Sequence, residues 1–374
     1  MKVAIVHYWF ITRRGGEKVV ESILKLFPDA DIYTLFYDKS TYGNFLENNK
    51  VYTSILDKPF LRKHYQKIFP LYPLGIRSLK LKEDYDLIIS SESGPAKGIK
   101  ISNSAKHICY IHSPMRYCWT HTDLYVQSVN PLWRPLMRYF LKRLKMWDKK
   151  TVSNVDVYIA NSNNVANRVK KFYNRESLVL YPPISDDLFS KPLSETNKKE
   201  IYLSFGALTP YKKIDLLIDV FNVIDRKLII IGQGSEKKKL QQKANSNISF
   251  LEYSSWGQIE KVLCNTKALL FPGEEDFGMI PLEVMAYGIP VIAYKKGGAL
   301  ETVVENKTDI SKSSGIFFDE QEKQPVINAI NLFEEVENEF NSNWIKEYAS
   351  KFSEKHFLSN FIQIVGKINK GNKV

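Results

Sequence analysis

The chain has 374 residues, of which 44% are hydrophobic and 25% charged, and this length is comfortable for two globular domains. The composition excludes a disordered chain, a collagen-like repeat and a disulfide scaffold, and no apolar run approaches the roughly 18 to 20 residues of a membrane-spanning helix. The formal net charge of +12 lies entirely within residues 1–187, which hold 29 basic and 17 acidic side chains. The three cysteines show no metal-ligand spacing, which suits a reducing cytosol.

Predicted strands and helices alternate along the first half of the chain. An apolar run at 3–6, without a signal-peptide cleavage site, is expected to be the first strand, and helical periodicity at 17–27 follows the turn at Gly15 and Gly16. Strands that alternate with helices predict a parallel sheet, so this half is expected to be a Rossmann-like α/β domain. Its further strands are expected at 32–35, 87–89, 108–111 and 157–160.

The alternation of predicted strands and helices is interrupted after residue 181, where Pro182, Pro183 and the polar stretch 190–200 indicate a linker. A second α/β series follows it. The sequence therefore predicts two doubly wound parallel-sheet domains, 1–187 and 188–353, that face each other across a ligand-binding cleft, with a helix in 354–374 packed back on the first. In the second domain strands are expected at 201–205, 227–231, 248–251, 268–271 and 291–294, and helices at 213–223, 235–244, 255–263 and 281–287.

Two segments of the first half combine basic with aromatic and aliphatic side chains. Residues 58–82 carry seven basic side chains and no acidic one, and residues 131–150 form a basic amphipathic helix in outline. Three interpretations of this pattern stay open: a core-facing helix with a solvated basic face, a surface that meets an anionic membrane, and a nucleic-acid site. No nucleic-acid-binding motif accompanies the charge, so nucleic acid is the least favoured partner.

The most informative stretch is 271–302, in which a strand, an acidic loop and a helix follow one another. The helix is expected to begin at Pro281, and its N-terminus offers unpaired N–H groups and a positive dipole end to a diphosphate. Glu275 and Glu283 flank the loop, eight residues apart. Such a pair occurs by chance in many chains, so its value depends on the surrounding sequence.

Taken together, the motifs resemble those of the retaining nucleotide-sugar glycosyltransferases of family 4, which have the two-domain GT-B fold, and in particular the mannosyltransferases that build bacterial O-antigen and capsule repeats. The resemblance covers nearly the whole chain. It is carried by Arg14-Gly15-Gly16-Glu17-Lys18, Tyr85 to Ser91, His107 to Tyr117, Asn161-Ser162, Tyr181-Pro182-Pro183, Pro210 to Asp215 and Glu275 to Thr302.

The resemblance implies roles for individual residues. Glu275 would contact the hydroxyls of the donor sugar, Glu283 those of the ribose, and Lys212 the diphosphate, so that His112, Glu275 and Lys212 form the catalytic set. Ala207 stands where the family commonly has an arginine, and Lys213 is a candidate to replace its phosphate contact. The remaining donor-binding residues would be Gly15, Gly16, Gly206, Gly232, Phe277, Gly278, Met279 and Ile280, and the acceptor or the membrane would meet Arg116, Arg138, Lys142, Arg143 and Lys145.

The activity implied by the resemblance is transfer of mannose from GDP-mannose to a polyprenyl-diphosphate-linked saccharide, with retention of configuration, at the cytoplasmic face of a bacterial membrane. No cofactor and no metal are expected, because neither Asp29-Ala30-Asp31 nor Asp84-Tyr85-Asp86 follows a predicted strand. Alternatives from other classes stay open: a UDP- or dTDP-sugar donor, a non-catalytic nucleotide- or polysaccharide-binding descendant, and an epimerase or phosphorylase on the same fold.

Overall fold

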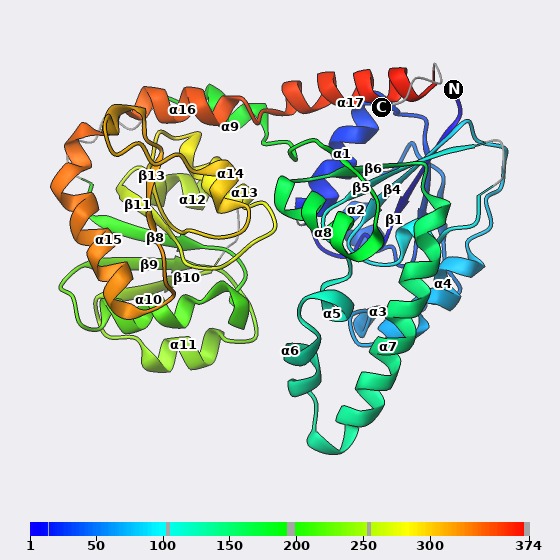
Figure 1. Ribbon diagram of the computed structural model, residues 1–374, viewed down its shortest axis with the longest axis horizontal. Coiled ribbons are helices and arrows are strands. Elements are labelled where there is room, and N and C mark those ends of the chain that lie inside the picture. Colours follow the sequence, from blue (N-terminus) through cyan, green and yellow to red (C-terminus); the bar gives the residue numbers. More distant parts are fainter. Residues whose placement is uncertain (14, 102–104, 193–198, 253–255, 370–374) are drawn as a thin grey trace. The chain divides into compact units, whose positions relative to one another are not determined.

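The computed structural model describes residues 1–13, 15–101, 105–192, 199–252 and 256–369, and these divide into two compact units (Figure 1). Unit 1 comprises Met1–Pro183 and Phe357–Val374, and unit 2 comprises Ile184–His356. The predicted boundaries at 187 and 353 lie a few residues away. The two crossings of the chain run side by side, because the Ile184 N–H donates to the carbonyl of Phe352 and the Glu354 N–H donates to the carbonyl of Ile184.

The prolines at 182 and 183 therefore mark the first crossing between the units. The polar stretch 190–200, which was expected to be part of the linker, begins inside unit 2 directly after helix α9 (Asp186–Ser190), and its residues 193–198 lie outside the described part of the chain. Arg14, one residue of the predicted first glycine turn, also lies outside it, and Gly15 and Gly16, which were expected to form that turn, are instead the first two residues of a helix.

Unit 1 is built on a seven-stranded parallel sheet in the order β3-β2-β1-β4-β5-β6-β7. The predicted parallel sheet is confirmed, and its five inner strands, β2, β1, β4, β5 and β6 in sheet order, are largely buried. The sequence missed the edge strands β3 and β7, which are two or three residues long and only partly buried. The strands are β1 (Val3–His7), β2 (Asp31–Thr34), β3 (Val51–Thr53), β4 (Leu87–Glu92), β5 (Lys106–Ile111), β6 (Val157–Ala160) and β7 (Leu178–Val179).

Helices cover both faces of this sheet. On one face α1 (Gly15–Leu26) and the C-terminal α17 (Glu354–Asn369) share a buried cluster with β1 and β4. On the other face α4 (Tyr72–Ser78) and α7 (Arg134–Lys150) pack on the same strands. The other helical segments of unit 1 are α2 (Lys39–Tyr42), α3 (Pro59–Lys63), η1 (Phe69–Leu71), η2 (Ala96–Gly98), α5 (Arg116–Trp119), α6 (Thr122–Gln127), η3 (Pro131–Trp133), η4 (Thr151–Asn154) and α8 (Asn163–Tyr173).

Unit 2 contains a six-stranded parallel sheet in the order β10-β9-β8-β11-β12-β13. Its strands are β8 (Ile201–Phe205), β9 (Lys227–Ile231), β10 (Ile248–Leu251), β11 (Thr266–Phe271), β12 (Val291–Tyr294) and β13 (Gly315–Phe318). Its further helical segments are η5 (Pro210–Lys212), α10 (Ile214–Phe221), α11 (Lys237–Lys243), α12 (Trp256–Leu263), α13 (Met279–Met285), α14 (Ala299–Thr302), η6 (Ile310–Lys312), α15 (Lys323–Val336), η7 (Glu337–Glu339) and α16 (Ser342–Ser350).

Two helices of unit 2 begin two residues away from their predicted starts, and the first of them, α11, begins at Lys237 rather than at 235. Helix α13 begins at Met279 rather than at Pro281, directly after Gly278, whose φ of 89° turns the chain into the helix. Pro281 is tolerated at the third helical position, because N–H groups of the first turn have no partner within the helix in any case. None of the helices in the described ranges has the length and apolarity to cross a membrane.

Candidate active site

Lys212 and Glu275 meet in unit 2 beyond the carboxyl ends of β8 and β11. The Lys212 ammonium forms an ion pair with the Glu275 carboxylate, and the two side chains are only 13% and 17% exposed. The ammonium also lies 5.6 Å from the ring centroid of Tyr211 and 5.9 Å from that of Phe271. The structure thus brings together two of the three residues that the sequence predicts to be catalytic.

The loop that carries Glu275 is fixed from two sides by close backbone approaches. A Cβ on Gly273 would lie 3.0 Å from Cα of Lys212, and a Cβ on Gly297 would lie 2.3 Å from the carbonyl oxygen of Glu275. The Gly298 N–H donates to that same carbonyl at 2.8 Å. A side chain has no room at Gly297, and at Gly273 it would require its neighbours to shift, so these close approaches hold the backbone of the Glu275 loop in place.

Gly206 and Gly232 bring the ends of β8 and β9 to the start of α13. Gly206 has φ of 136°, and a Cβ on Gly232 would lie 1.8 Å from its carbonyl oxygen. On the other side of Gly206, the Cδ1 of Ile280 lies 3.0 Å from the position of a Cβ. In unit 2, the predicted donor-binding residues Gly206, Gly232 and Ile280 therefore lie side by side, at the ends of β8 and β9 and the start of α13.

The other donor-binding predictions differ in what they expose. Phe277 is buried and packs on Phe352 with ring centroids 6.0 Å apart, so its side chain is not available to a ligand. Glu283 is buried on α13, whereas Met279 and Ile280 are partly exposed. The buried Asp276, next to Glu275, was not predicted, since nothing in the sequence distinguishes it from its acidic neighbours.

Lys213 does not follow Lys212 toward Glu275. Its backbone is left-handed, with φ of 56°, and it lines a separate pocket of about 140 Å³ together with Thr209, Glu236 and Lys239. Ala207, where the family commonly has an arginine, is exposed. The contact that Lys213 was expected to supply to a diphosphate is therefore not part of the Lys212–Glu275 arrangement.

In unit 1, His112 follows β5 and lies beside the start of α1. Its Nε2 is 2.8 Å from Oγ of Ser91, and its backbone N–H donates to the carbonyl of Glu92. A Cβ on Gly16 would lie 3.5 Å from that Nε2 and 2.7 Å from the hydroxyl of Tyr8. The structure thus gathers the predicted His112 and Gly16, with Gly15 next to it, at the carboxyl ends of β1, β4 and β5.

The sequence missed two polar groups of this arrangement, Ser91 and Tyr8, because only the sheet order places them beside His112. His7 and Glu17 are fully buried nearby, with Nε2 and Oε1 3.8 Å apart. Neither ring nitrogen of His7 has a hydrogen-bond partner within the described ranges.

A fully buried ionic network lies next to His112, because the His112 N–H donates to the backbone carbonyl of Glu92, one of its members. The Lys97 ammonium forms ion pairs with Asp148 and, at 3.3 Å, with Glu92, and the Lys97 N–H donates to Glu92 at 2.9 Å. The indole of Trp119 and the hydroxyl of Tyr173 donate to Asp148 at 2.7 and 2.8 Å. The network joins the end of β4 to α7, and nothing in the sequence pattern indicated it.

Burial and charge act in opposite directions on this network. Burial raises the pKa of Glu92 to about 7 although the Lys97 cation lowers it. Burial alone would lower the pKa of Lys97, but the Asp148 and Glu92 carboxylates raise it well above the ordinary value. The lysine is therefore charged at neutral pH, and its charge is what makes burial of two carboxylates tolerable.

The predicted acceptor and membrane residues lie on the helices after β5. Arg116 begins α5 and is partly exposed, whereas Arg138, Lys142 and Arg143 are exposed on α7. Lys145 is exposed too, and its ammonium lies 4.3 Å from the ring centroid of Trp119.

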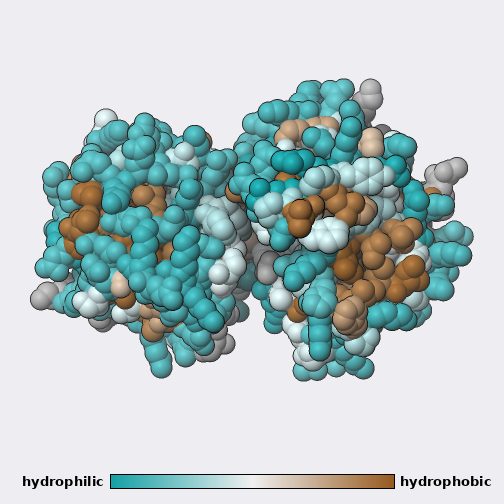
Figure 2. Space-filling view, turned by 90° about the horizontal axis from the view of Figure 1, so that it is seen from below, coloured by the Kyte–Doolittle hydropathy of each residue, from teal (hydrophilic) through white to brown (hydrophobic). Residues whose placement is uncertain are grey.

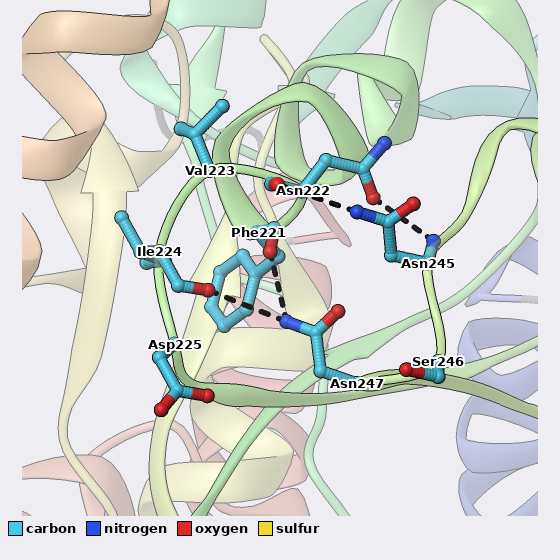
Figure 3. Close-up of a pocket in the computed structure, with 8 residues that line it drawn as sticks. All are labelled: Phe221, Asn222, Val223, Ile224, Asp225, Asn245, Ser246 and Asn247. Atoms are coloured by element: carbon cyan, nitrogen blue, oxygen red, sulfur yellow. Dashed lines mark hydrogen bonds between the residues drawn. The ribbon is translucent and has the colours of Figure 1, made fainter.

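A larger pocket in unit 2, of about 450 Å³, is lined by none of the predicted donor-binding residues (Figure 3). It is formed before β9 and β10, at the amino ends of the strands. The side chain of Asn247 donates to the carbonyls of Phe221 and Arg226, and Asn222 accepts from the N–H of Asn245. These amides hold the turns together, so the pocket is a structural feature. In the described ranges, no three His, Cys, Asp or Glu side chains gather as metal ligands would.

Two family models cover the two units in turn. The Glycosyltransferase Family 4 model matches residues 13–188, and the Glycosyl transferases group 1 model matches residues 185–352. Together the two models span residues 13–352, so the chain belongs to the glycosyltransferases that these models describe. Its two parallel-sheet units have the GT-B fold.

Curated relatives of similar length include mannosyltransferases. An uncharacterized glycosyltransferase of Methanocaldococcus jannaschii is 26% identical, over 94% of this chain and 94% of the relative. The alpha-1,3/1,6-mannosyltransferase ALG2 of Kluyveromyces lactis is 25% identical, over 91% of this chain and 79% of the relative. The O-antigen chain mannosyltransferase RfbU of Salmonella typhimurium is 27% identical over 52% of this chain and 57% of the relative.

Solved structures share the fold at lower identity. The Anabaena protein HepE, solved in complex with UDP, has a TM-score of 0.72 and 18% identity, covering 98% of this chain and 100% of that one. The sucrose-phosphate synthase of Thermosynechococcus elongatus has a TM-score of 0.73 and 14% identity, covering 99% and 100%. At these identities the likeness extends to the fold alone.

Proposed function

We propose that the protein is a retaining mannosyltransferase that transfers mannose from GDP-mannose to a polyprenyl-diphosphate-linked saccharide in the synthesis of a bacterial surface polysaccharide. The observation that carries this proposal is the Lys212–Glu275 ion pair of unit 2. The mannosyltransferases among the relatives support the choice of sugar.

In the proposed reaction the bond between C1 of mannose and the diphosphate breaks, and a bond from the acceptor oxygen to C1 forms on the same face. The acceptor proton passes to the departing phosphate oxygen, so no protein nucleophile is needed. Lys212 offsets the negative charge that develops on the diphosphate. Glu275, held by that same lysine, accepts hydrogen bonds from sugar hydroxyls, and Glu283 accepts them from the ribose.

The residues of unit 1 contact both the donor and the acceptor in this proposal. His112, fixed by Ser91, contacts the transferred sugar, and the backbone at Gly15 and Gly16 approaches the donor phosphate and the acceptor. Arg116 holds a phosphate of the acceptor. The acceptor is lipid-linked, so the protein works at the cytoplasmic face of the membrane, where the excess positive charge of residues 1–187 attracts anionic lipid. No metal takes part, and we expect EDTA to leave the rate unchanged.

Thermal stabilisation by nucleotides tests the donor assignment. GDP at 100 times its Kd is expected to stabilise unit 2 by about 2.7 kcal/mol, and UDP, dTDP and ADP at the same concentration by much less. Glu283→Ala is expected to abolish the shift, whereas Glu320→Ala, at an exposed glutamate of the same unit, is expected to preserve it. A shift with no nucleotide would favour the non-catalytic alternative and overturn the proposal.

A second donor class has a specific observation in its favour. The similar HepE structure holds UDP, and a shift with UDP alone would keep the reaction while replacing the sugar. The exposed Ala207 leaves one phosphate contact fewer than the family pattern implies, so the GDP affinity itself is informative.

A further inference from the structure

The segment from α6 to the first half of α7 differs from the rest of unit 1 in how little of it is buried. We call residues 122–140 the α6–α7 hairpin. In Figure 1, α6 and α7 extend together away from the sheet of unit 1, and the turn between them lies at the far end. Of the described side chains in this hairpin, only Val126 is buried.

The two halves of α7 serve different purposes. In the second half, Leu141, Leu144 and Asp148 are buried at helical spacing, and Trp147 packs so tightly on Gly98 that a Cβ there would lie 2.5 Å from its ring. In the first half no residue from 134 to 140 is buried. The helix is therefore anchored at its C-terminal end and presents its N-terminal end to the surroundings.

The exposed end of the hairpin is apolar and aromatic. Leu132 is 86% exposed and Trp133 is 62% exposed, at the turn itself. Figure 2, which views unit 1 from the side of this turn, shows apolar residues gathered there. The exposed apolar side chains on the hairpin are Leu124, Tyr125, Leu132, Trp133, Leu136, Tyr139 and Phe140. Phe60, Leu71 and Leu74 are also exposed, on α3, η1 and α4, and these three elements share a hydrophobic cluster with α7.

The charges around this apolar surface are mainly positive, and Asp123 on α6 is the one exposed acidic side chain among the described residues 116–150. Residues 116–150 contain eight basic side chains and two acidic ones, of which Asp148 is fully buried in its ion pair. Arg138, Lys142 and Arg143 are exposed on α7 behind the apolar turn. Apolar side chains at the end of a helix, followed by a collar of cations, match the depth profile of an anionic bilayer, in which acyl chains lie beneath phosphate headgroups.

We propose that the α6–α7 hairpin inserts its apolar turn into an anionic lipid bilayer, with Leu132 and Trp133 below the headgroups and Arg138, Lys142 and Arg143 among them. This deepens the proposed function, on which it rests for the lipid-linked acceptor, by assigning the membrane contact to a particular apolar element. Asp148, near the C-terminal end of α7, pairs with Lys97 in the buried network next to His112. Insertion of the hairpin would therefore fix the distance between His112 and the lipid surface.

Sedimentation with vesicles tests the proposal with the full chain and needs no sugar transfer. We expect binding to vesicles of phosphatidylcholine with 30 mol% phosphatidylglycerol, and a loss of about tenfold or more in partitioning for Leu132→Ser/Trp133→Ser, since two large apolar side chains leave the bilayer. The matched control is Val223→Ser, a 63% exposed apolar side chain of unit 2, which is expected to bind like the wild type.

Fluorescence distinguishes insertion from attraction by charge alone. Vesicles with brominated acyl chains are expected to quench the wild-type protein more strongly than Trp133→Phe, and part of the binding is expected to survive 0.5 M salt. Wild-type affinity in the double variant, or equal quenching of both proteins, would overturn the proposal. The proposal would also be overturned if the wild-type protein did not bind vesicles and formed a dimer that Trp133→Ser dissociates, because a second copy of the chain would then cover the turn. Sugar transfer to a soluble acceptor analogue without vesicle binding would refute only the insertion.

Discussion

Replacement of Lys97 by methionine would leave two buried carboxylates without their cation. In the structure Lys97 is fully buried and forms ion pairs with both Glu92 and Asp148. Removing one partner of a buried pair typically costs about 3–5 kcal/mol, because the remaining charge is desolvated without compensation. Unit 1 has about 200 residues, for which each kcal/mol lowers the Tm by roughly 2–4 °C. We therefore expect Lys97→Met to lower the Tm of unit 1 by about 6–20 °C.

Calorimetry measures this loss with an internal reference, because unit 2 contains no part of the network and its transition should not move. An exposed pair supplies the matched control: Lys227→Met, which removes the partner of Glu200 at the surface, is expected to cost less than about 1 kcal/mol. The double variant Lys97→Met/Glu92→Gln is expected to recover part of the loss, since one of the stranded charges is gone.

The pH dependence provides an independent check. The pKa of Glu92 is raised to about 7, above its value in the unfolded chain, so the folded state binds more protons between about 4.5 and 7 and loses stability as the pH rises through that window. Without Lys97 the window extends upward, and the cost of the substitution should be larger at pH 8 than at pH 5. A loss below about 1 kcal/mol, or one that is independent of pH, would refute the assignment of Lys97 as the cation that stabilises this network.

Three further variants test other parts of the structure. Gly232→Ala is expected to destabilise unit 2 by about 1–3 kcal/mol in urea unfolding, because its Cβ would lie 1.8 Å from the carbonyl oxygen of Gly206. The control is Gly366→Ala in α17, where a Cβ meets open space and a slight stabilisation of unit 1 is expected. Equal effects of the two substitutions would contradict the close approach at Gly232. Burial lowers the pKa of His107 to about 4, so the unfolded chain binds a proton before the folded chain does as the pH falls below 6.5. The folded state therefore loses about 3 kcal/mol of stability between pH 6.5 and 4, and His107→Gln should remove this loss. An acid-unfolding curve that is unchanged in this variant would contradict the prediction. Glu275→Ala is expected to lower kcat of transfer by about 100-fold or more with a smaller change in the donor KM, and an unaltered kcat would remove it from the site.

The sequence was sufficient for the strands of both sheets wherever an apolar run is bounded by turn residues. The observed bounds of β8, β9, β10 and β12 are those predicted: β8, β9 and β12 are largely apolar runs inside the sheet, and the edge strand β10 still carries three apolar residues in four. The edge strands β3 and β7 and the late strand β13 were missed, since two to four residues give too little pattern to separate a strand from a loop. The early start of α13 was missed because the left-handed Gly278 is not visible in a periodicity.

The site residues that belong to a sequence motif were predicted, and those that only the fold brings to the site were missed. Lys212 and Glu275 lie 63 residues apart and were connected by the resemblance before the structure showed them in contact. Lys97 lies in a short polar segment and looks like a solvated lysine, because its burial depends on Asp148, 51 residues further along the chain. Ser91 and Tyr8 reach His112 only through the order of the sheet, which the sequence does not specify to that detail.

The central claim is tested most directly by incubating the protein with GDP-mannose labelled in the sugar and with polyprenyl-linked saccharides extracted from bacterial membranes. The account predicts label in the organic phase that an α-mannosidase releases, because GDP-mannose is α-configured and retention gives an α-linked product. The Glu275→Ala variant should give little or none. Label that stays in the aqueous phase as free mannose, transfer only from a UDP-sugar, or a β-linked product would contradict the account.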